Sequence, residues 1–404
     1  MENILNKFNS SKELFDFIRS TDTTEFPSLK SILAKYDTGR VNAGEILSAI
    51  KKNKANALII DARSEKEFEE TSLPCSLNFP VLHNDERHNT GLVYKKYSQT
   101  SAVWLAVQYA LPKINLLKNF LEENDASGKD IFVYCWRGGG RSAYLSKMIT
   151  DAGYTPKILT GGYKAYRKKV NDFFSQEIFP YDLIELSGMT GCGKTELLKL
   201  LSSNLPVLDL EDAAKHYSSL LGHIPYEING IEPVKNQSAF ENNIFSQIKL
   251  NKFIEDKGTF LAESESKRVG KFQVPEIIYA KLITAPSVRI VSSMDYRVKR
   301  IVKDYFGKDL KGIEPMIRIL TERKSFFRQQ LSAVIFDELI NLLNNERVNE
   351  FTEIMIREYY DKKYKVKEKN ILAEVSSDDS ISAVKEIGNI FKMTIEKKIS
   401  PKMI

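Results

Sequence analysis

The chain has 404 residues, of which 42% are hydrophobic and 28% charged, an ordinary composition for a globular protein with a sizeable core. At roughly 100–200 residues per domain, this length allows two or three domains. No apolar run approaches the ~20 residues that a membrane span needs, and the first thirty residues lack a signal-peptide pattern. We therefore expect a cytoplasmic protein with no membrane contact. The cysteines Cys75, Cys135 and Cys192 are too few and scattered for a disulfide framework or a zinc site.

The net charge is +6, and the basic residues are unevenly distributed. They gather at Arg297, Lys299, Arg300 and Lys303, and again at Lys362, Lys363, Lys365, Lys367 and Lys369. Such a cluster is typical either of a solvated surface or of a surface that follows a nucleic-acid backbone. The charge pattern alone leaves both interpretations open.

The first 172 residues predict a helical extension followed by an α/β domain. Residues 1–38 indicate short amphipathic helices around Leu14, Phe15, Ile18 and Ile32. From residue 39 on, apolar runs typical of buried strands alternate with helical segments. The strands are expected at 58–60, 76–80, 131–134 and 157–159, and the helices at 64–71, 100–124 (interrupted at Pro112) and 142–152. This alternation predicts a parallel sheet over residues 39–172.

A second α/β domain is predicted over residues 181–310, after a boundary between residues 171 and 181. Its strands are expected at 183–186, 207–210, 259–262 and 288–291. A helical C-terminal region is predicted over residues 311–404, because the pattern from about Glu314 onward is helical and charged.

Residues 134–142 read Tyr-Cys-Trp-Arg-Gly-Gly-Gly-Arg-Ser between a predicted strand and a predicted helix. Three consecutive glycines let the backbone curl so that successive N–H groups point inward and bind an anion. The helix N-terminus adds partial positive charge, and Arg137 and Arg141 add full charges. These charges favour the thiolate of Cys135, which can hold a persulfide or a selenosulfide. The pattern predicts a nucleophilic cysteine, and the alternative is a buried cysteine before a glycine-rich turn.

Residues 188–195 read Gly-Met-Thr-Gly-Cys-Gly-Lys-Thr and match the phosphate-binding pattern G-x-x-x-x-G-K-[ST] between a strand and a helix. The backbone amides would face phosphate oxygens, the lysine would neutralise the terminal phosphate, and the threonine would reach a Mg²⁺ ion. The candidate phosphate-binding residues are therefore Gly188, Gly191, Gly193, Lys194 and Thr195, with Thr195 also the candidate metal ligand. The pattern recognises phosphate groups and not the nucleoside, so a nucleoside triphosphate such as ATP or GTP satisfies it, and so does a diphosphate.

Four acidic residues are candidates for supporting a metal or acting as a base: Asp209, Glu211, Glu263 and Glu265. Glu263 ends an apolar predicted strand, which favours a metal-supporting role. The alternative for such an acid is that it merely caps the next helix. His216 is a further candidate of this group, with a purely structural role as its alternative.

The stretch around Cys135 resembles the active-site loop of rhodanese-like domains. Asp61-Ala62-Arg63 with Glu67-Phe68 is similar to the acid and arginine signature of that family. The resemblance implies sulfur or selenium transfer, with the candidate catalytic residues Cys135, Arg137, Arg141, Asp61 and Arg63. The family's His-Ile-Pro-Gly-Ala element is replaced by Ser72-Leu73-Pro74-Cys75-Ser76. We expect Cys75 to pack in the interior, and the alternative is a thiol that resolves Cys135.

A rhodanese-like domain followed by a P-loop domain resembles the tRNA 2-selenouridine synthase family over roughly residues 55–370. The resemblance extends to Asn84-Asp85-Glu86-Arg87, Gly161-Gly162-Tyr163, Asp209-Leu210-Glu211 with His216, and Glu263-Ser264-Glu265. It implies a rhodanese-like parallel-sheet domain, a P-loop NTPase-like α/β domain and a helical C-terminal region.

The resemblance also implies a two-step transferase reaction on tRNA. The wobble 2-thiouridine of the anticodon loop is S-geranylated from geranyl diphosphate, and selenium from selenophosphate then replaces the geranylthio group. The P-loop would bind the diphosphate with Mg²⁺, Cys135 would receive or position selenium, and an apolar groove that no sequence pattern locates would hold the prenyl chain. The implied partner is a selenophosphate-producing enzyme, and the candidate contacts to tRNA are Arg87, Arg268, Arg297 and Arg300.

Two other functions fit the same residues. In the first, the P-loop uses ATP to activate a uridine and Cys135 carries persulfide sulfur, which gives an ATP-dependent tRNA thiolation. In the second, the chain is a non-catalytic sulfur carrier whose P-loop senses a nucleotide.

Overall fold

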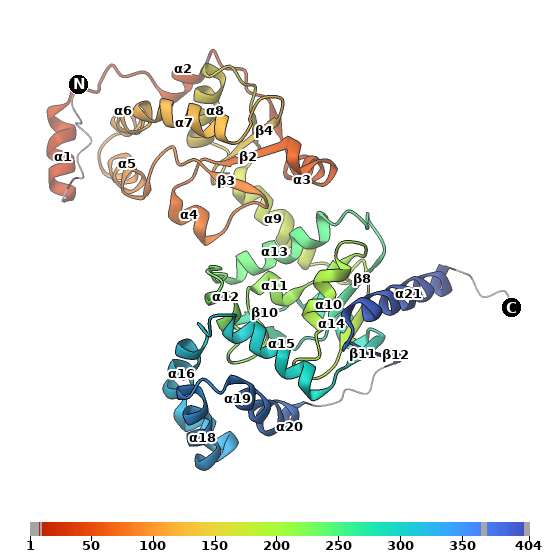
Figure 1. Ribbon diagram of the computed structural model, residues 1–404. Coiled ribbons are helices and arrows are strands. Elements are labelled where there is room, and N and C mark those ends of the chain that lie inside the picture. Colours follow the sequence, from red (N-terminus) through yellow and green to blue (C-terminus); the bar gives the residue numbers. More distant parts are fainter. Residues whose placement is uncertain (1–7, 9, 365–369, 400–404) are drawn as a thin grey trace. The chain divides into compact units, whose positions relative to one another are not determined.

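The computed structural model describes residues 8, 10–364 and 370–399, and the chain divides into two compact units, Met1–Phe173 and Phe174–Ile404 (Figure 1). Each unit has its own parallel sheet with helices around it, which confirms the predicted α/β fold class. Of the second basic cluster, Lys365, Lys367 and Lys369 lie outside the described residues. Within the part of the chain that is described, no helix is both long and apolar enough to cross a membrane.

The first unit contains a five-stranded sheet in which all paired strands are parallel. The order across the sheet is β1 (Arg40–Val41), β5 (Lys157–Leu159), β4 (Asp130–Tyr134), β2 (Ala57–Asp61) and β3 (Ser76–Asn78). β4 lies in the middle, and its Val133 pairs with Ile60 of β2, with both side chains fully buried. Parallel strands covered on both faces read as continuous apolar runs, which is why the sequence predicted β2 and β4, whereas the two-residue strand β1 was not predicted.

Helices surround this sheet, and the predicted N-terminal extension packs against the same core. The helices are α1 (Ser11–Ser20), α2 (Leu29–Leu33), α3 (Ala43–Lys52), α4 (Glu65–Glu70), α5 (Asn84–Lys96), α6 (Gln99–Ala110), α7 (Ile114–Glu123), α8 (Gly140–Asp151) and α9 (Gly162–Phe174), with 3₁₀ turns η1 (Lys54–Asn56) and η2 (Leu111–Lys113). α1 presents Leu14 and Ile18 on one face, because they are four residues apart. Both are fully buried in the core of the first unit.

The second unit contains another five-stranded parallel sheet and a separate antiparallel ribbon. The sheet order is β12 (Ile371–Ser376), β11 (Ser287–Val291), β6 (Asp182–Ser187), β8 (Thr259–Glu263) and β7 (Val207–Leu208), and the ribbon pairs β9 (Arg268–Val269) with β10 (Phe272–Gln273). The edge strand β12 lies within the region expected to be helical. Its sequence, Ile-Leu-Ala-Glu-Val-Ser, has a short apolar run, but Val375 is the one β12 residue that is buried, as befits an edge strand.

Apart from β12, the described part of residues 311–404 is helical, as predicted. The helices of the second unit are α10 (Lys194–Leu201), α11 (Leu210–Ala214), α12 (Ile224–Glu227), α13 (Gln237–Lys249), α14 (Glu276–Thr284), α15 (Met294–Phe306), α16 (Ile313–Glu322), α17 (Lys324–Leu331), α18 (Ala333–Asn344), α19 (Val348–Met355), the π-helical turn η3 (Ile356–Tyr360), α20 (Asp361–Lys363) and α21 (Ser380–Ile399). Helices α16 to α19 share a hydrophobic core around Phe327, Leu339 and Phe351. The second unit therefore combines a sheet layer with a helical subdomain.

Candidate functional site

The Cys135 loop begins where β4, the middle strand of the first sheet, ends, and it leads into α8. Cys135 is 4% exposed, and its Sγ lies 3.3 Å from the hydroxyl oxygen of Ser142. That hydroxyl donates to the carbonyl oxygen of Gly139 at 3.0 Å. Because a hydroxyl has one proton, it accepts from the thiol in this arrangement and can turn to donate to a thiolate. Ser142 was not selected from the sequence, although its place in the first turn after the triple glycine was an available signal.

The first turn of α9 clamps the Cys135 loop. The backbone N–H of Tyr163 donates to the Cys135 carbonyl oxygen at 2.8 Å, and that of Lys164 donates to the Trp136 carbonyl oxygen at 3.0 Å. Gly162 has a φ of +59°, and a Cβ at this position would lie 2.2 Å from the Cys135 carbonyl oxygen. A residue without a side chain is therefore required for the close approach that seats the loop.

Glu67 holds two of the predicted arginines near the loop. This residue of α4 forms ion pairs with Arg141 of α8 and, at 2.8 Å, with Arg87 of α5. Burial alone would raise the pKa of Glu67, but the two guanidinium groups outweigh burial and lower it. Arg137, on the loop itself, is exposed. The positive charge of the arginines therefore exceeds the negative charge of the carboxylate near the loop. Glu67 belongs to the site, although the sequence analysis named it only within the acid and arginine signature of rhodanese-like domains.

Asp61 and Arg63 form a buried brace and do not face an external substrate. The Arg63 guanidinium donates to both carboxylate oxygens of Asp61, at 2.6–3.0 Å, and to the Thr71 carbonyl oxygen at 2.6 Å. Both side chains are at most 1% exposed. The guanidinium carbon also lies 4.5 Å from the ring centroid of Tyr163. Direct catalytic contact, which the sequence had favoured for this pair, therefore does not fit the structure.

Cys75 is exposed, so the expectation that it packs in the interior is wrong. It has a φ of +60° and occupies the turn directly before β3. Its neighbours Pro74 and Ser76 are half-buried, because this turn runs along the surface of the unit.

The P-loop follows β6, the middle strand of the second sheet, and leads into α10. Its three predicted glycines have positive φ values of 147° at Gly188, 79° at Gly191 and 84° at Gly193. The Lys194 Nζ donates to the carbonyl oxygens of Gly188 at 2.9 Å and of Met189 at 3.3 Å. Burial would lower the pKa of Lys194, but nearby thiol and carboxyl groups outweigh burial and raise it. The lysine is therefore a charged group folded back over the loop.

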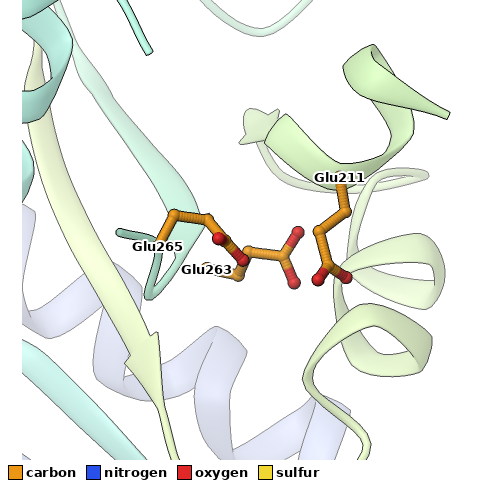
Figure 2. Close-up of side chains that lie close together, drawn as sticks. All are labelled: Glu211, Glu263 and Glu265. Carbon is orange, nitrogen blue, oxygen red and sulfur yellow. The ribbon is translucent and has the colours of Figure 1, made fainter. Parts of the chain in front are cut away.

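Three buried carboxyl groups converge in the second unit (Figure 2). Glu211 comes from α11, Glu263 ends β8 and Glu265 lies just beyond it, and one oxygen of each lies within 4.8 Å of the others. The Thr195 hydroxyl oxygen lies 3.1 Å from Glu211 Oε2 and 3.3 Å from Glu263 Oε2. The structure thus brings together three acids and a threonine that were predicted from separate segments.

The cluster of three glutamates fits a divalent cation. Burial, the largest cause, and repulsion between neighbouring acids raise the pKa of each of the three carboxyl groups. Glu263 Oε1 is buried and has no hydrogen-bond partner among the described residues. Oxygen ligands of this kind suit Mg²⁺, whose charge would offset the repulsion. Glu211, Glu263 and Glu265, with Thr195, are therefore the residues that would hold it.

Asp209 and His216 have structural contacts of their own. Asp209 caps α11, because its carboxylate accepts from the Asp212 N–H at 2.7 Å, as the capping alternative predicts. The His216 ring lies against Gly270, where a Cβ would be 2.9 Å from it. Burial, followed by the charge of His223, lowers the pKa of His216. A neutral imidazole packed against a glycine agrees with the purely structural role that was the alternative for His216.

Arg297 and Arg300 hold the P-loop, which corrects their expected place on a surface that contacts tRNA. Arg297 is 5% exposed, donates to the Thr190 carbonyl oxygen at 2.9 Å and pairs with Asp361 at 2.6 Å. The Arg300 Nε lies 2.9 Å from a carboxylate oxygen of Glu196. These internal bonds occupy both guanidinium groups.

Together, the two units define an enzyme that joins a rhodanese-like unit to a P-loop unit. Residues 42–169 match the family model of the rhodanese-like domain, and residues 181–392, about half of the chain, match that of the tRNA 2-selenouridine synthase AAA domain. These matches cover the Cys135 loop and the P-loop respectively.

Curated relatives support the same assignment. The chain is 31% identical over 290 residues to the tRNA 2-selenouridine synthase of Pseudomonas syringae pv. tomato, which covers 71% of this chain and 74% of the relative. It is 33% identical over 278 residues to that of Bdellovibrio bacteriovorus (64% and 68% covered) and 28% identical over 332 residues to that of Shewanella sp. strain ANA-3 (76% and 87% covered). The chain belongs to the tRNA 2-selenouridine synthase family, as the sequence resemblance implied.

Gly162→Ala is expected to lower the free energy of unfolding by about 2–4 kcal/mol, because it adds a clash to a left-handed backbone. It should also change the rate at which iodoacetamide alkylates Cys135, since the clash displaces the loop. Gly153→Ala is the matched control: its φ is +94°, but a Cβ there meets nothing within 4 Å. If urea denaturation showed the same loss of free energy of unfolding in the two variants, Gly162 would not be required for the contact between α9 and the Cys135 loop.

Glu263→Gln is expected to raise the melting temperature at pH 8 in the absence of metal and to reduce stabilisation by Mg²⁺. Because folding raises the pKa of this carboxyl, its contribution to stability is complete below the ordinary pKa of a glutamate and is lost as pH rises through the raised value. Mg²⁺ requires the ionised form, so its effect on the wild type should grow from pH 6 to pH 8. Glu374→Gln on β12, an exposed acid, is the control. An unchanged Mg²⁺ response in Glu263→Gln would rule out this cation site.

Proposed function

We propose that this enzyme converts the wobble 2-thiouridine of tRNA to 2-selenouridine through an S-geranylated intermediate, with geranyl diphosphate and selenophosphate as co-substrates. The observation that carries the proposal is that one chain pairs the clamped Cys135 loop with a P-loop beside three buried carboxyl groups. The relatives, which are tRNA 2-selenouridine synthases by name, support the selenouridine product.

In the proposed first step, the P-loop binds the diphosphate of geranyl diphosphate. The thiouridine sulfur attacks the first carbon of the geranyl group, and the carbon–oxygen bond to the diphosphate breaks. The loop amides and Lys194 stabilise the negative charge that the leaving diphosphate acquires. Glu211, Glu263 and Glu265 would hold a Mg²⁺ ion that supplies further neutralisation of this charge. The step uses the P-loop without hydrolysis of a nucleotide.

In the proposed second step, the Cys135 loop positions selenium. The selenium of selenophosphate attacks the C2 carbon of the uracil ring, and the geranylthio group leaves as a thiolate. Water then cleaves the phosphorus–selenium bond and releases phosphate. The loop amides, Arg137 and Arg141 stabilise the anionic groups, and Ser142 can donate to a thiolate at Cys135. The implied source of selenophosphate is a partner enzyme that produces it.

A cavity of about 310 Å³ beside the Cys135 loop supports the geranyl intermediate. Val103, Ala106 and Val107 of α6 line it, and Arg141 and Tyr144 of α8 lie on its other side. This volume is within the range of pockets that hold small ligands, roughly 300–1,000 Å³. A mainly apolar wall next to the arginine of the loop suits a hydrocarbon chain attached to a polar nucleobase.

Exposed basic residues support tRNA binding. Arg268 of β9 is exposed, the Arg87 side chain is half-exposed, and Lys362 and Lys363 lie on the surface at α20. Lysine and arginine side chains of this kind neutralise phosphates and release counterions. We therefore propose these four residues, in place of Arg297 and Arg300, as contacts to the tRNA backbone.

Incubation of thiolated tRNA with the enzyme, geranyl diphosphate and selenophosphate should yield 2-selenouridine, detected by mass spectrometry of the nucleosides. Lys194→Ala should lose geranylation by a factor on the order of a hundred or more, because the leaving group loses its counter-charge. Cys135→Ser should retain geranylation and accumulate geranylthiouridine.

Cys75→Ser is the matched control for Cys135→Ser, since it makes the same change at an exposed cysteine, and it should react like the wild type. Formation of neither modified nucleoside would refute the proposed function. A strict requirement for ATP, with sulfur incorporated in place of selenium, would favour the thiolation alternative.

Ala106→Phe is expected to fill part of the cavity and to slow selenation of a geranylthiouridine RNA by a factor on the order of ten or more. Geranylation, which we assign to the P-loop, should continue, so geranylthiouridine should accumulate. Ala280→Phe, at an exposed position of α14, is the control for the added phenyl group. If Ala106→Phe selenated the RNA at the wild-type rate, the geranyl group would bind elsewhere.

A further inference from the structure

Trp136 directly follows Cys135 in the loop and is 41% exposed. The chain has two tryptophans, and the other, Trp104, is partly buried against the core of the first unit. Full burial of a large apolar side chain stabilises a protein by roughly 1.5–3 kcal/mol. The exposed indole beside the nucleophile therefore gives up part of the stabilisation that its burial would provide.

The indole is backed by a rigid stack and is not a loose surface group. Its ring stacks on that of Tyr163, with centroids 5.6 Å apart and planes inclined by 29°. Tyr163 is 2% exposed and hydrogen-bonds through its hydroxyl to Thr71. The guanidinium carbon of Arg63, which Asp61 holds in place, lies 4.5 Å from the centroid of the Tyr163 ring.

The backbone of Trp136 is held as firmly as its ring. Its carbonyl oxygen accepts from the Lys164 N–H at 3.0 Å, and the Cys135 carbonyl oxygen accepts from the preceding amide, that of Tyr163, at 2.8 Å. The nucleophile and the indole are thus positioned by the same helix turn. The ring of Tyr163 covers part of the indole, and the rest of the Trp136 side chain is exposed to solvent.

We propose that the exposed surface of Trp136 is a binding site for a nucleobase, on which the target uracil ring stacks beside Cys135. This inference rests on the proposed function, because it takes a nucleotide of tRNA as the substrate. Bases of single-stranded loops are commonly recognised by stacking on aromatic side chains, and each stack contributes roughly 1–3 kcal/mol. A base in an anticodon loop is already unpaired, so placing it on the indole costs little.

The proposal also gives a role to the buried pair of Asp61 and Arg63. The pair does not contact substrate, but it supports Tyr163, and Tyr163 supports the indole. Arg137, the next residue of the loop, is exposed and carries a charge that suits the phosphate of a stacked nucleotide.

Tryptophan fluorescence tests the contact independently of catalysis. In the full-length Trp104→Phe variant, Trp136 is the one remaining tryptophan. Titration with an anticodon stem-loop RNA that contains 2-thiouridine should quench its emission, whereas the same RNA with an abasic wobble position should bind without that quenching. Equal quenching by both RNAs, or emission from the free protein typical of a fully covered indole, would overturn the proposal.

Kinetics of selenation provide the second test. Trp136→Ala should raise KM for geranylthiouridine RNA by roughly 5- to 150-fold, which corresponds to a stack worth 1–3 kcal/mol, and should change kcat less. Trp136→Phe should restore most of the binding, because it keeps an aromatic face. The rate of Cys135 alkylation by iodoacetamide should be unchanged in both variants, which shows that the loop is intact.

The outcomes separate this inference from the proposed function. If wild-type enzyme forms 2-selenouridine and Trp136→Ala has a wild-type KM, the nucleobase site is wrong while the function stands. If both variants lose alkylation together with activity, Trp136 is a structural residue and the inference is equally wrong. If the wild type forms no modified nucleoside, the proposed function fails, and the fluorescence titration still decides whether a base stacks on Trp136.

Discussion

Parallel strand pairing is the constraint on which both functional loops depend. In a parallel sheet the carboxyl ends of neighbouring strands lie at one edge, and loops that leave this edge converge. The Cys135 loop follows β4 and the P-loop follows β6, and each is the middle strand of its five-stranded sheet. Each loop therefore starts from the interior of its sheet and leads into the N-terminus of a helix, α8 or α10.

The two sites handle charge in opposite ways. Around Cys135, guanidinium groups outnumber carboxylates, and Glu67 serves to hold Arg87 and Arg141 in place. Beside the P-loop, burial and then mutual repulsion raise the pKa values of three carboxyl groups. An arrangement of this second kind is costly for a protein without a cation, because buried like charges are poorly solvated. That cost is the physical reason for proposing a divalent cation at this site.

Local sequence was a good guide wherever a function depends on backbone conformation. The glycine patterns predicted both loops: Gly138 in the first, and Gly188, Gly191 and Gly193 in the second, have positive φ values that few other residues adopt. The contacts of individual side chains were harder to predict from the sequence. Arg297 and Arg300 read as surface charges, yet both point to partners 60 to 110 residues away in sequence, such as Asp361 and Glu196. A sequence window cannot show such pairs, because they form when distant segments fold together.

The sequence alone determined the two α/β units, their order and the positions of the Cys135 loop and the P-loop pattern, since each depends on short-range spacing and apolar periodicity. The tertiary structure decided which charged residues remain available to a substrate. In the folded chain, Asp61 and Arg63 form a buried ion pair. Glu211 lies next to Glu263 and Glu265. Cys75 and Trp136 are exposed at the surface. These outcomes follow from packing, because burial and the pairing of a charge depend on neighbours in space and not on neighbours along the chain.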